Sequence, residues 1–195
     1  MNDMTSSPPG MLRALGYSAI WVDQGIINAD TLRSQFVAYT EGTDSDTAHF
    51  RHSAFLRFVS SLSRVDDATL AAIRTLDDDS QSDTELARSR LIEVIRRKLL
   101  TEAQLLALRK DPSICVHPAT CRVIERELVR FALAEDASTR VREIMLASQD
   151  PEVHRIIVDC PRTSMADLEW LATNGLSKAV RNIAMQQKRR EQNDV

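Results

Sequence analysis

Two thiols and an imidazole lie within seven residues of one another in the second half of the chain. Cys115, His117 and Cys121 are residue types that bind zinc, and His154 and Cys160 would add ligands if their helices stacked nearby. The spacing is wider than the paired C-x-x-C arrangement, and Cys121 borders an apolar helix face, where a small thiol packs well. We therefore interpret the cysteines as core residues. We expect no cofactor and no metal, with Cys115, His117 and Cys121 as the weak metal candidates.

A second pattern is basic. Arg122, Arg126 and Arg130 recur at every fourth residue, which places them on one face of a helix. Such a stripe engages acidic groups on another protein, or follows the phosphates of a nucleic acid. Glutamates interleave with these arginines, and surface arginines are usually just solvated, so nucleic acid is the less favoured partner. The predicted binding residues are Arg122, Arg126, Arg130, Arg142, Arg155 and Arg181.

Catalytic motifs are missing from the sequence: it has no Gly-rich phosphate loop, nucleophile elbow or H-E-x-x-H. Trp170 and Asp167 pair an aromatic ring with a carboxylate, as base-excision pockets do. Trp170 also follows an apolar helical pattern, so we expect it either to pack at a seam between helices or to lie half-exposed on the surface, and we expect Trp21 to lie in the core. His49 and His52 have no accompanying carboxylate motif and are interpreted as surface histidines. The prediction is a protein that is not an enzyme.

Composition favours an all-α fold. The chain has 195 residues, of which 43% are apolar and 27% charged, with only five glycines and six prolines. Its apolar runs are far shorter than the ~20 residues that span a bilayer, and no basic segment followed by an apolar block opens the sequence. Three cysteines do not suggest a disulfide framework. These features predict a cytoplasmic protein with no membrane partner.

Helical periodicity defines the elements that would carry these residues. The spacing predicts helices over 11–22, 49–62, 86–100 and 121–133, with shorter helices between and after them. Helix starts are expected where a short polar side chain precedes an apolar run. The predicted N-caps are Asn28 or Asp30, Asp66 or Asp67, Thr101 with a capping box, Asp136 or Ser138, Asp150 and Ser164.

Apolar residue pairs recur along the chain. Their spacing is 35, 36 and then 27 residues, counted over Leu70/Ile73, Leu105/Leu108, Val141/Ile144 and Leu168/Leu171. Each helix pair is apolar on one side only, so it needs neighbours to bury that side. The sequence therefore predicts an all-α, right-handed α-solenoid of about five antiparallel helix pairs. Residues 1–9 are expected to form a disordered leader, 10–187 a single solenoid domain and 188–195 a frayed tail.

The last units resemble a known repeat family. The leucine-rich repeat variant has the order Val-Arg, Pro-x-Thr, Leu-x-x-Leu-Ala and Val-Arg, and the matching residues are Val153-His154-Arg155, Pro161-Arg162-Thr163, Leu168-Glu169-Trp170-Leu171-Ala172 and Val180-Arg181. The resemblance is best over 111–187, whereas 10–110 has longer units that look more like HEAT repeats. It implies an α-solenoid with a binding role. The family's cysteine-ligated iron–sulfur cluster does not carry over, because the four-cysteine cluster that holds it has no counterpart here.

Charge is distributed unevenly. Residues 1–85 carry six Lys and Arg against 13 Asp and Glu, whereas 86–195 carry 19 against 15. That basic excess is too small to imply nucleic acid by itself. We expect a protein-interaction or scaffold module that binds a protein or peptide on a face of the helices, as a monomer or a homodimer. The alternative is a HEAT-like nucleic-acid-binding protein, or a DNA-glycosylase-like enzyme that uses the arginine-rich face.

Overall fold

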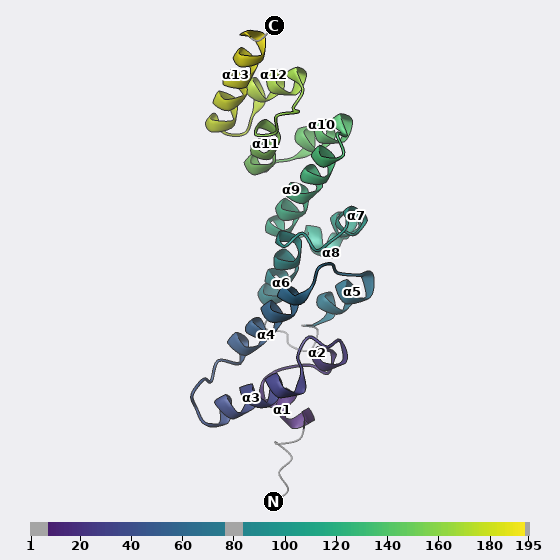
Figure 1. The fold of residues 1–195 in the computed structure, drawn as a ribbon, viewed down its shortest axis with the longest axis vertical. Coiled ribbons are helices and arrows are strands. Elements are labelled where there is room, and N and C mark those ends of the chain that lie inside the picture. Colours follow the sequence, from purple (N-terminus) through teal and green to yellow (C-terminus); the bar gives the residue numbers. More distant parts are fainter. Residues whose placement is uncertain (1–7, 77–83, 194–195) are drawn as a thin grey trace, which may run out of the picture. The chain divides into compact units, whose positions relative to one another are not determined.

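The computed structural model describes residues 8–76 and 84–193 (Figure 1). Within these ranges the chain forms thirteen helices and no strand, which confirms the all-α prediction. The helices gather into two compact units, Met1–Leu100 and Thr101–Val195, and each unit is described by itself.

The first unit contains six helices, which pack as α1 on α3, α3 on α4, α4 on α6 and α5 on α6. Their bounds are α1 Pro8–Ala14, α2 Ile20–Asp23, α3 Ala29–Thr40, α4 Thr47–Ser61, α5 Asp67–Thr75 and α6 Thr84–Arg96. The sequence predicted a disordered leader over 1–9, whereas α1 already begins at Pro8. Residues 1–7 lie outside the described ranges. Asn28 and Asp66 cap α3 and α5 as predicted, each by accepting a backbone N–H three residues on.

A continuous helix over 11–22 was the wrong prediction. Gly16 has a φ of +69°, in the left-handed region that favours glycine, and the chain turns there between α1 and α2. A side chain at this position would also collide with the guanidinium of Arg51, whose Nη1 donates to the Leu15 carbonyl at 3.0 Å. The apolar period survives the turn, because Leu15 and Trp21 are both buried.

Aromatic and polar side chains share the core of the first unit. Trp21 is 1% exposed, as predicted, and the guanidinium of the equally buried Arg90 lies 4.8 Å from its ring centroid. The Tyr17 hydroxyl donates to Gln35 Oε1 at 2.8 Å, and Gln35 Nε2 donates to the Phe50 carbonyl. Burial raises the pKa of Tyr17 to about 12, although the Gln35 hydrogen bond and nearby arginines act in the opposite direction.

The second unit contains seven helices, in which α9 contacts α7, α8, α10 and α11, and α13 contacts α11 and α12. Their bounds are α7 Glu102–Lys110, α8 Pro112–Cys115, α9 Pro118–Ala134, α10 Ser138–Ala147, α11 Pro151–Val158, α12 Met165–Asn174 and α13 Lys178–Asn193. α13 therefore continues as helix well beyond residue 187, where the sequence suggested a frayed tail, and residues 194–195 lie outside the described ranges. The core is built from apolar side chains of α9 to α13, with Met145, Val153, Ile157 and Leu171 fully buried.

Most predicted caps of the second unit are present. Thr101 and Gln104 form the reciprocal capping box, and Asp150 and Ser164 cap α11 and α12 through their side chains. The cap of α10 was predicted wrongly. Its N-cap is Ala137, which has no side-chain acceptor, because Asp136 adopts a left-handed φ of 58° one residue earlier.

Candidate functional site

The arginines predicted to bind a partner are mostly held by groups of the second unit itself. Arg126, the middle residue of the predicted stripe, donates from Nε to Asp150 Oδ2 at 2.6 Å and from Nη2 to Asp150 Oδ1 at 3.1 Å. The Asp150 side chain is 3% exposed and the Arg126 side chain 33%. This two-pronged pair joins α9 to the N-cap of α11.

The Arg126–Asp150 pair belongs to a longer network. Asp150 N donates to Ser148 Oγ at 3.1 Å, and Ser148 Oγ donates to Glu125 Oε2 at 3.0 Å. Glu125 in turn pairs with Arg109 of α7, with Oε1 and Nη2 2.6 Å apart. Burial alone would raise the pKa of the Asp150 carboxyl, but the hydrogen bonds from Arg126 and from Glu152 N lower it below its usual value.

A second cross-helix pair repeats this arrangement. Arg142 of α10 donates from Nη1 to Asp167 Oδ1 at 2.9 Å, and Asp167 lies in the first turn of α12 with 4% exposure. The two pairs span 24 and 25 residues, so each arginine reaches from its own helix to the start of the second helix after it. Both cations are therefore occupied in positioning helices.

The other predicted arginines differ in their surroundings. Arg130 pairs with Glu127 on its own helix, and Arg155 with Asp159. Arg181 Nη1 donates to the Gly175 carbonyl at 2.6 Å. Arg122 is exposed and makes neither a hydrogen bond nor an ion pair with the residues that the structure describes. The structure thus brings no continuous stripe of free cations to this part of the second unit.

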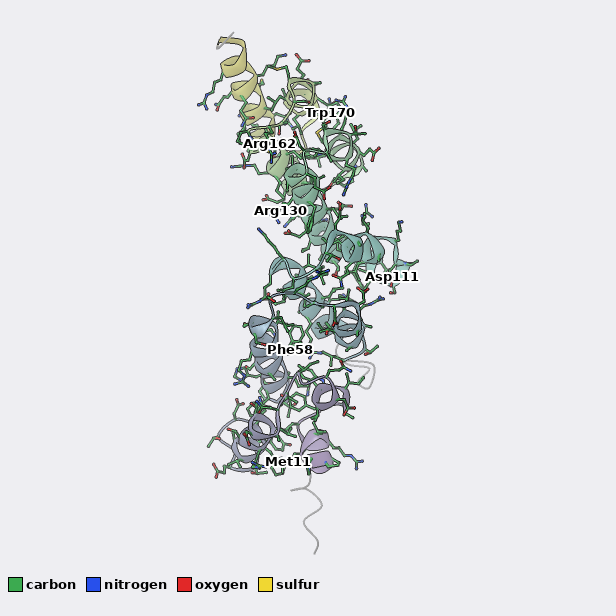
Figure 2. All side chains as sticks on the ribbon, turned by 45° about the vertical axis from the view of Figure 1, so that its right-hand side comes forward. Met11, Phe58, Asp111, Arg130, Arg162 and Trp170 are labelled. Carbon is green, nitrogen blue, oxygen red and sulfur yellow. The ribbon has the colours of Figure 1, made fainter. Side chains whose placement is uncertain are left out.

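The carboxylate that the sequence pairs with Trp170 is already bound by other side chains. Asp167 is used by Arg142 and by Ser164, whose Oγ donates to it at 2.7 Å. The cavity beside Asp167 has a volume of about 20 Å³, which is room for one water molecule rather than a nucleobase. Trp170, labelled in Figure 2, lies edge-on to the ring of His154 with 5.6 Å between the centroids, as expected for packing at a seam between helices.

His154 is a fully buried connector rather than a ligand. Its Nε2 lies 3.0 Å from the Met145 carbonyl, and Leu176 N donates to its Nδ1 at 3.2 Å. A carbonyl only accepts and a backbone N–H only donates, so these partners fix the neutral tautomer with the proton on Nε2. The ring therefore joins the end of α10, the body of α11 and the turn before α13.

The cysteine and histidine candidates do not assemble a metal centre. Among the described residues, no three His, Cys, Asp or Glu side chains come together in a group that holds a metal ion. Burial and the hydrogen bond with Cys115 raise the pKa of the Cys121 thiol to about 11, which keeps it protonated at neutral pH. Zinc binds the thiolate form, so the environment of Cys121 opposes coordination.

A basic surface that the sequence reasoning missed lies on α13. Lys178, Asn182, Met185 and Arg189 recur at helical spacing within roughly 60° of one another, opposite the buried face of Val180 and Ala184. All four are exposed, and we call them the outer face of α13. Neither Lys178 nor Arg189 makes an ion pair with any residue that the structure describes. The sequence prediction ended the helical domain at residue 187. A predicted helix that continued past this residue would have revealed the face from the spacing of these four residues alone.

Comparisons with protein-family models, with curated proteins and with solved structures found no match to this chain. Within residues 8–76 and 84–193, no helix combines the length and the apolar character needed to cross a bilayer. The geometry of the chain's own residues therefore carries the functional argument.

Proposed function

We propose that this protein is a non-enzymatic interaction module that binds an acidic segment of another protein on the outer face of α13. The observation that carries the proposal is the charge of that face. Lys178 and Arg189 flank Met185, which is 40% exposed, and both cations are free to meet carboxylates of a partner. A partner with an apolar side chain between acidic groups complements this pattern.

The arginine pairs support the choice of a protein over a nucleic acid. A phosphate-binding surface needs several uncommitted cations in a row, whereas Arg126 and Arg142 already hold buried carboxylates. The cavity next to Asp167 is also too small for an extruded base.

We further propose that the helices form a right-handed α-solenoid with units like those of the leucine-rich repeat variant. The support comes from the two ion pairs of the second unit, which recur at 24 and 25 residues and connect corresponding helices of successive pairs. Recurrent contacts between neighbours are the basis of solenoid stability.

Site-specific photocrosslinking tests the function. A photoreactive amino acid at Met185, expressed in the native cell, should give one dominant crosslink to an acidic peptide of another protein. The Lys178→Glu/Arg189→Glu variant should abolish that crosslink. The matched control is Arg64→Glu/Lys110→Glu, which reverses the same amount of charge at exposed residues outside α13 and should leave the crosslink in place.

Three outcomes would overturn the proposal. A crosslink that persists in Lys178→Glu/Arg189→Glu would show that the basic face does not select the partner. A crosslink to a second copy of the chain would assign the face to a homodimer. Crosslinking to nucleic acid, with affinity that falls steeply as salt rises, would favour the nucleic-acid alternative.

A further inference from the structure

A cavity of about 220 Å³ lies in the first unit, between the turn at 25–28 and one face of α4. The turn contributes Ile26, Ile27 and Asn28 to its lining, α3 contributes Thr31, and α4 contributes Ala54, Arg57, Phe58 and Ser61. The volume is below the range of about 300–1,000 Å³ that is typical of drug-sized ligands. The cavity therefore suits a small organic molecule.

The polar groups of the lining define the chemistry of a ligand. Arg57 is exposed and makes neither a hydrogen bond nor an ion pair with the residues that the structure describes, so its guanidinium is free to receive an anion. Asn28 uses Oδ1 to accept from Thr31 N, which leaves its amide hydrogens as donors. Both groups call for an acceptor on the ligand, and the positive charge of Arg57 favours a carboxylate.

Ser61, in contrast, can accept a hydrogen bond from a ligand. Its Oγ donates to the Phe58 carbonyl at 2.7 Å, so its single hydrogen is committed and its lone pairs remain to accept. Arg57 and Ser61 are four residues apart on α4, which makes them neighbours on one helix face. A hydrogen-bond donor close to the carboxylate of the ligand would therefore be complementary to Ser61.

The donor is more favourable as a hydroxyl than as an ammonium group. A second cation inside the cavity would be repelled by Arg57 at short range, whereas a neutral hydroxyl would not. Phe58, labelled in Figure 2, is half-buried and lines the cavity beside the buried Ile26 and Ile27, so its ring offers most of the apolar contact that these three residues give to a hydrocarbon group.

We propose that this cavity binds a small hydroxycarboxylic acid, whose carboxylate pairs with Arg57 and whose hydroxyl donates to Ser61. The proposal is independent of the outer face of α13, which belongs to the other unit. The first unit would then have a small-molecule site separate from the proposed protein-binding face of the second unit.

The ligand chemistry is tested with four probes on one carbon skeleton. Mandelate has the carboxylate, the hydroxyl and an apolar ring; phenylacetate lacks the hydroxyl, phenylglycine replaces it with ammonium, and mandelamide lacks the negative charge. Titration of the full chain, followed through its backbone amide NMR signals, should show mandelate binding with a Kd no weaker than about 1 mM. The shifts should lie in residues 25–31 and 54–61, and the other probes should bind at least about tenfold more weakly.

Variants test the assigned residues. Arg57→Met keeps the length of the side chain, removes its charge and should weaken mandelate binding at least about tenfold. Arg64→Met removes an exposed arginine that does not line the cavity and should have no effect. Ser61→Ala should weaken mandelate until it binds no better than phenylacetate.

Several results would overturn the proposal. Mandelamide binding as tightly as mandelate would remove the role of charge, and equal effects of Arg57→Met and Arg64→Met would remove the role of this arginine. Absence of any shift with mandelate at about 10 mM, well above the expected Kd, would show that the cavity does not take this class of acid.

Discussion

Arg126 donates two hydrogen bonds to the Asp150 carboxylate, from Nε to one oxygen at 2.6 Å and from Nη2 to the other at 3.1 Å. The same carboxylate accepts from Glu152 N as the N-cap of α11. One residue therefore ends the preceding loop, starts a helix and fixes that helix to α9. Because both hydrogen bonds of the Arg126 guanidinium go to Asp150, Arg126 is not free to bind a partner.

Breaking this pair should destabilise the second unit. Arg126 is partly exposed and Asp150 is buried, so we expect Arg126→Met to cost about 2 kcal/mol, between the ~1 kcal/mol of a surface pair and the ~3–5 kcal/mol of a buried one. Asp150→Asn keeps an amide oxygen to cap α11 but loses the charge. Urea unfolding of both variants and of the double variant should give a coupling energy of at least about 1 kcal/mol. Strict additivity would contradict the pairing.

The pKa of Asp150 predicts how this contribution depends on pH. The folded protein lowers the pKa of this carboxyl below its unfolded value of about 3.9. The stabilisation is therefore complete above that unfolded value and is lost as pH falls through the lower folded value. The stability gap between wild type and Asp150→Asn, measured by urea unfolding, should be constant near neutral pH and close below about pH 4. A gap that persists in acid would show that it does not arise from the charge.

Helix starts could be predicted from sequence because a cap is a local interaction. Thr101, Asp150 and Ser164 accept backbone N–H groups two or three residues ahead, so the sequence around each one contains everything the cap requires. The break at Gly16 was missed because the apolar period continues through it. Hydrophobic periodicity does not register a single residue with positive φ.

The pairing of the arginines could not be predicted in the same way. Arg126 and Arg142 meet carboxylates 24 and 25 residues away, and only the packing of three helices brings them together. From the sequence, their regular spacing indicated a free surface. The cavity at Arg57 was missed for a related reason, because its walls come from a turn, from α3 and from α4, and no local pattern unites them.

Tyr17 should make the first unit sensitive to base. Its pKa rises from 10.0 to about 12 on folding, mainly because the phenol is buried. The neutral phenol therefore contributes stability below pH 10, and this contribution is lost as pH rises from 10 towards 12. Tyr17→Phe should be less stable at neutral pH, since Gln35 loses its donor, and should lose less stability over that alkaline range. Unfolding monitored by circular dichroism would measure both effects.

Cys121 should be unreactive and metal-free in the native protein. Because its thiol has a pKa of about 11, little thiolate is present at neutral pH, and alkylation should be much faster in urea than in buffer. Protein purified without chelator should contain far less than one equivalent of zinc, and chelator should leave its unfolding midpoint unchanged. A stoichiometric metal, or a chelator-sensitive midpoint, would restore the zinc hypothesis for Cys115, His117 and Cys121.

His154 should be among the residues on which the second unit depends most. His154→Phe preserves a ring next to Trp170 but leaves the Met145 carbonyl and Leu176 N without the imidazole that pairs with them, and His154 itself is 1% exposed. Each buried unpaired group costs about 1–3 kcal/mol and two groups lose their partner, so the variant should lose about 2–6 kcal/mol on urea unfolding. His117→Phe is the control, because His117 precedes α9 without capping it through its side chain. Hydrogen exchange at Leu176 adds a local readout: it should accelerate in His154→Phe beyond the global loss of stability, and equal acceleration at all core amides would mean that the ring only fills space.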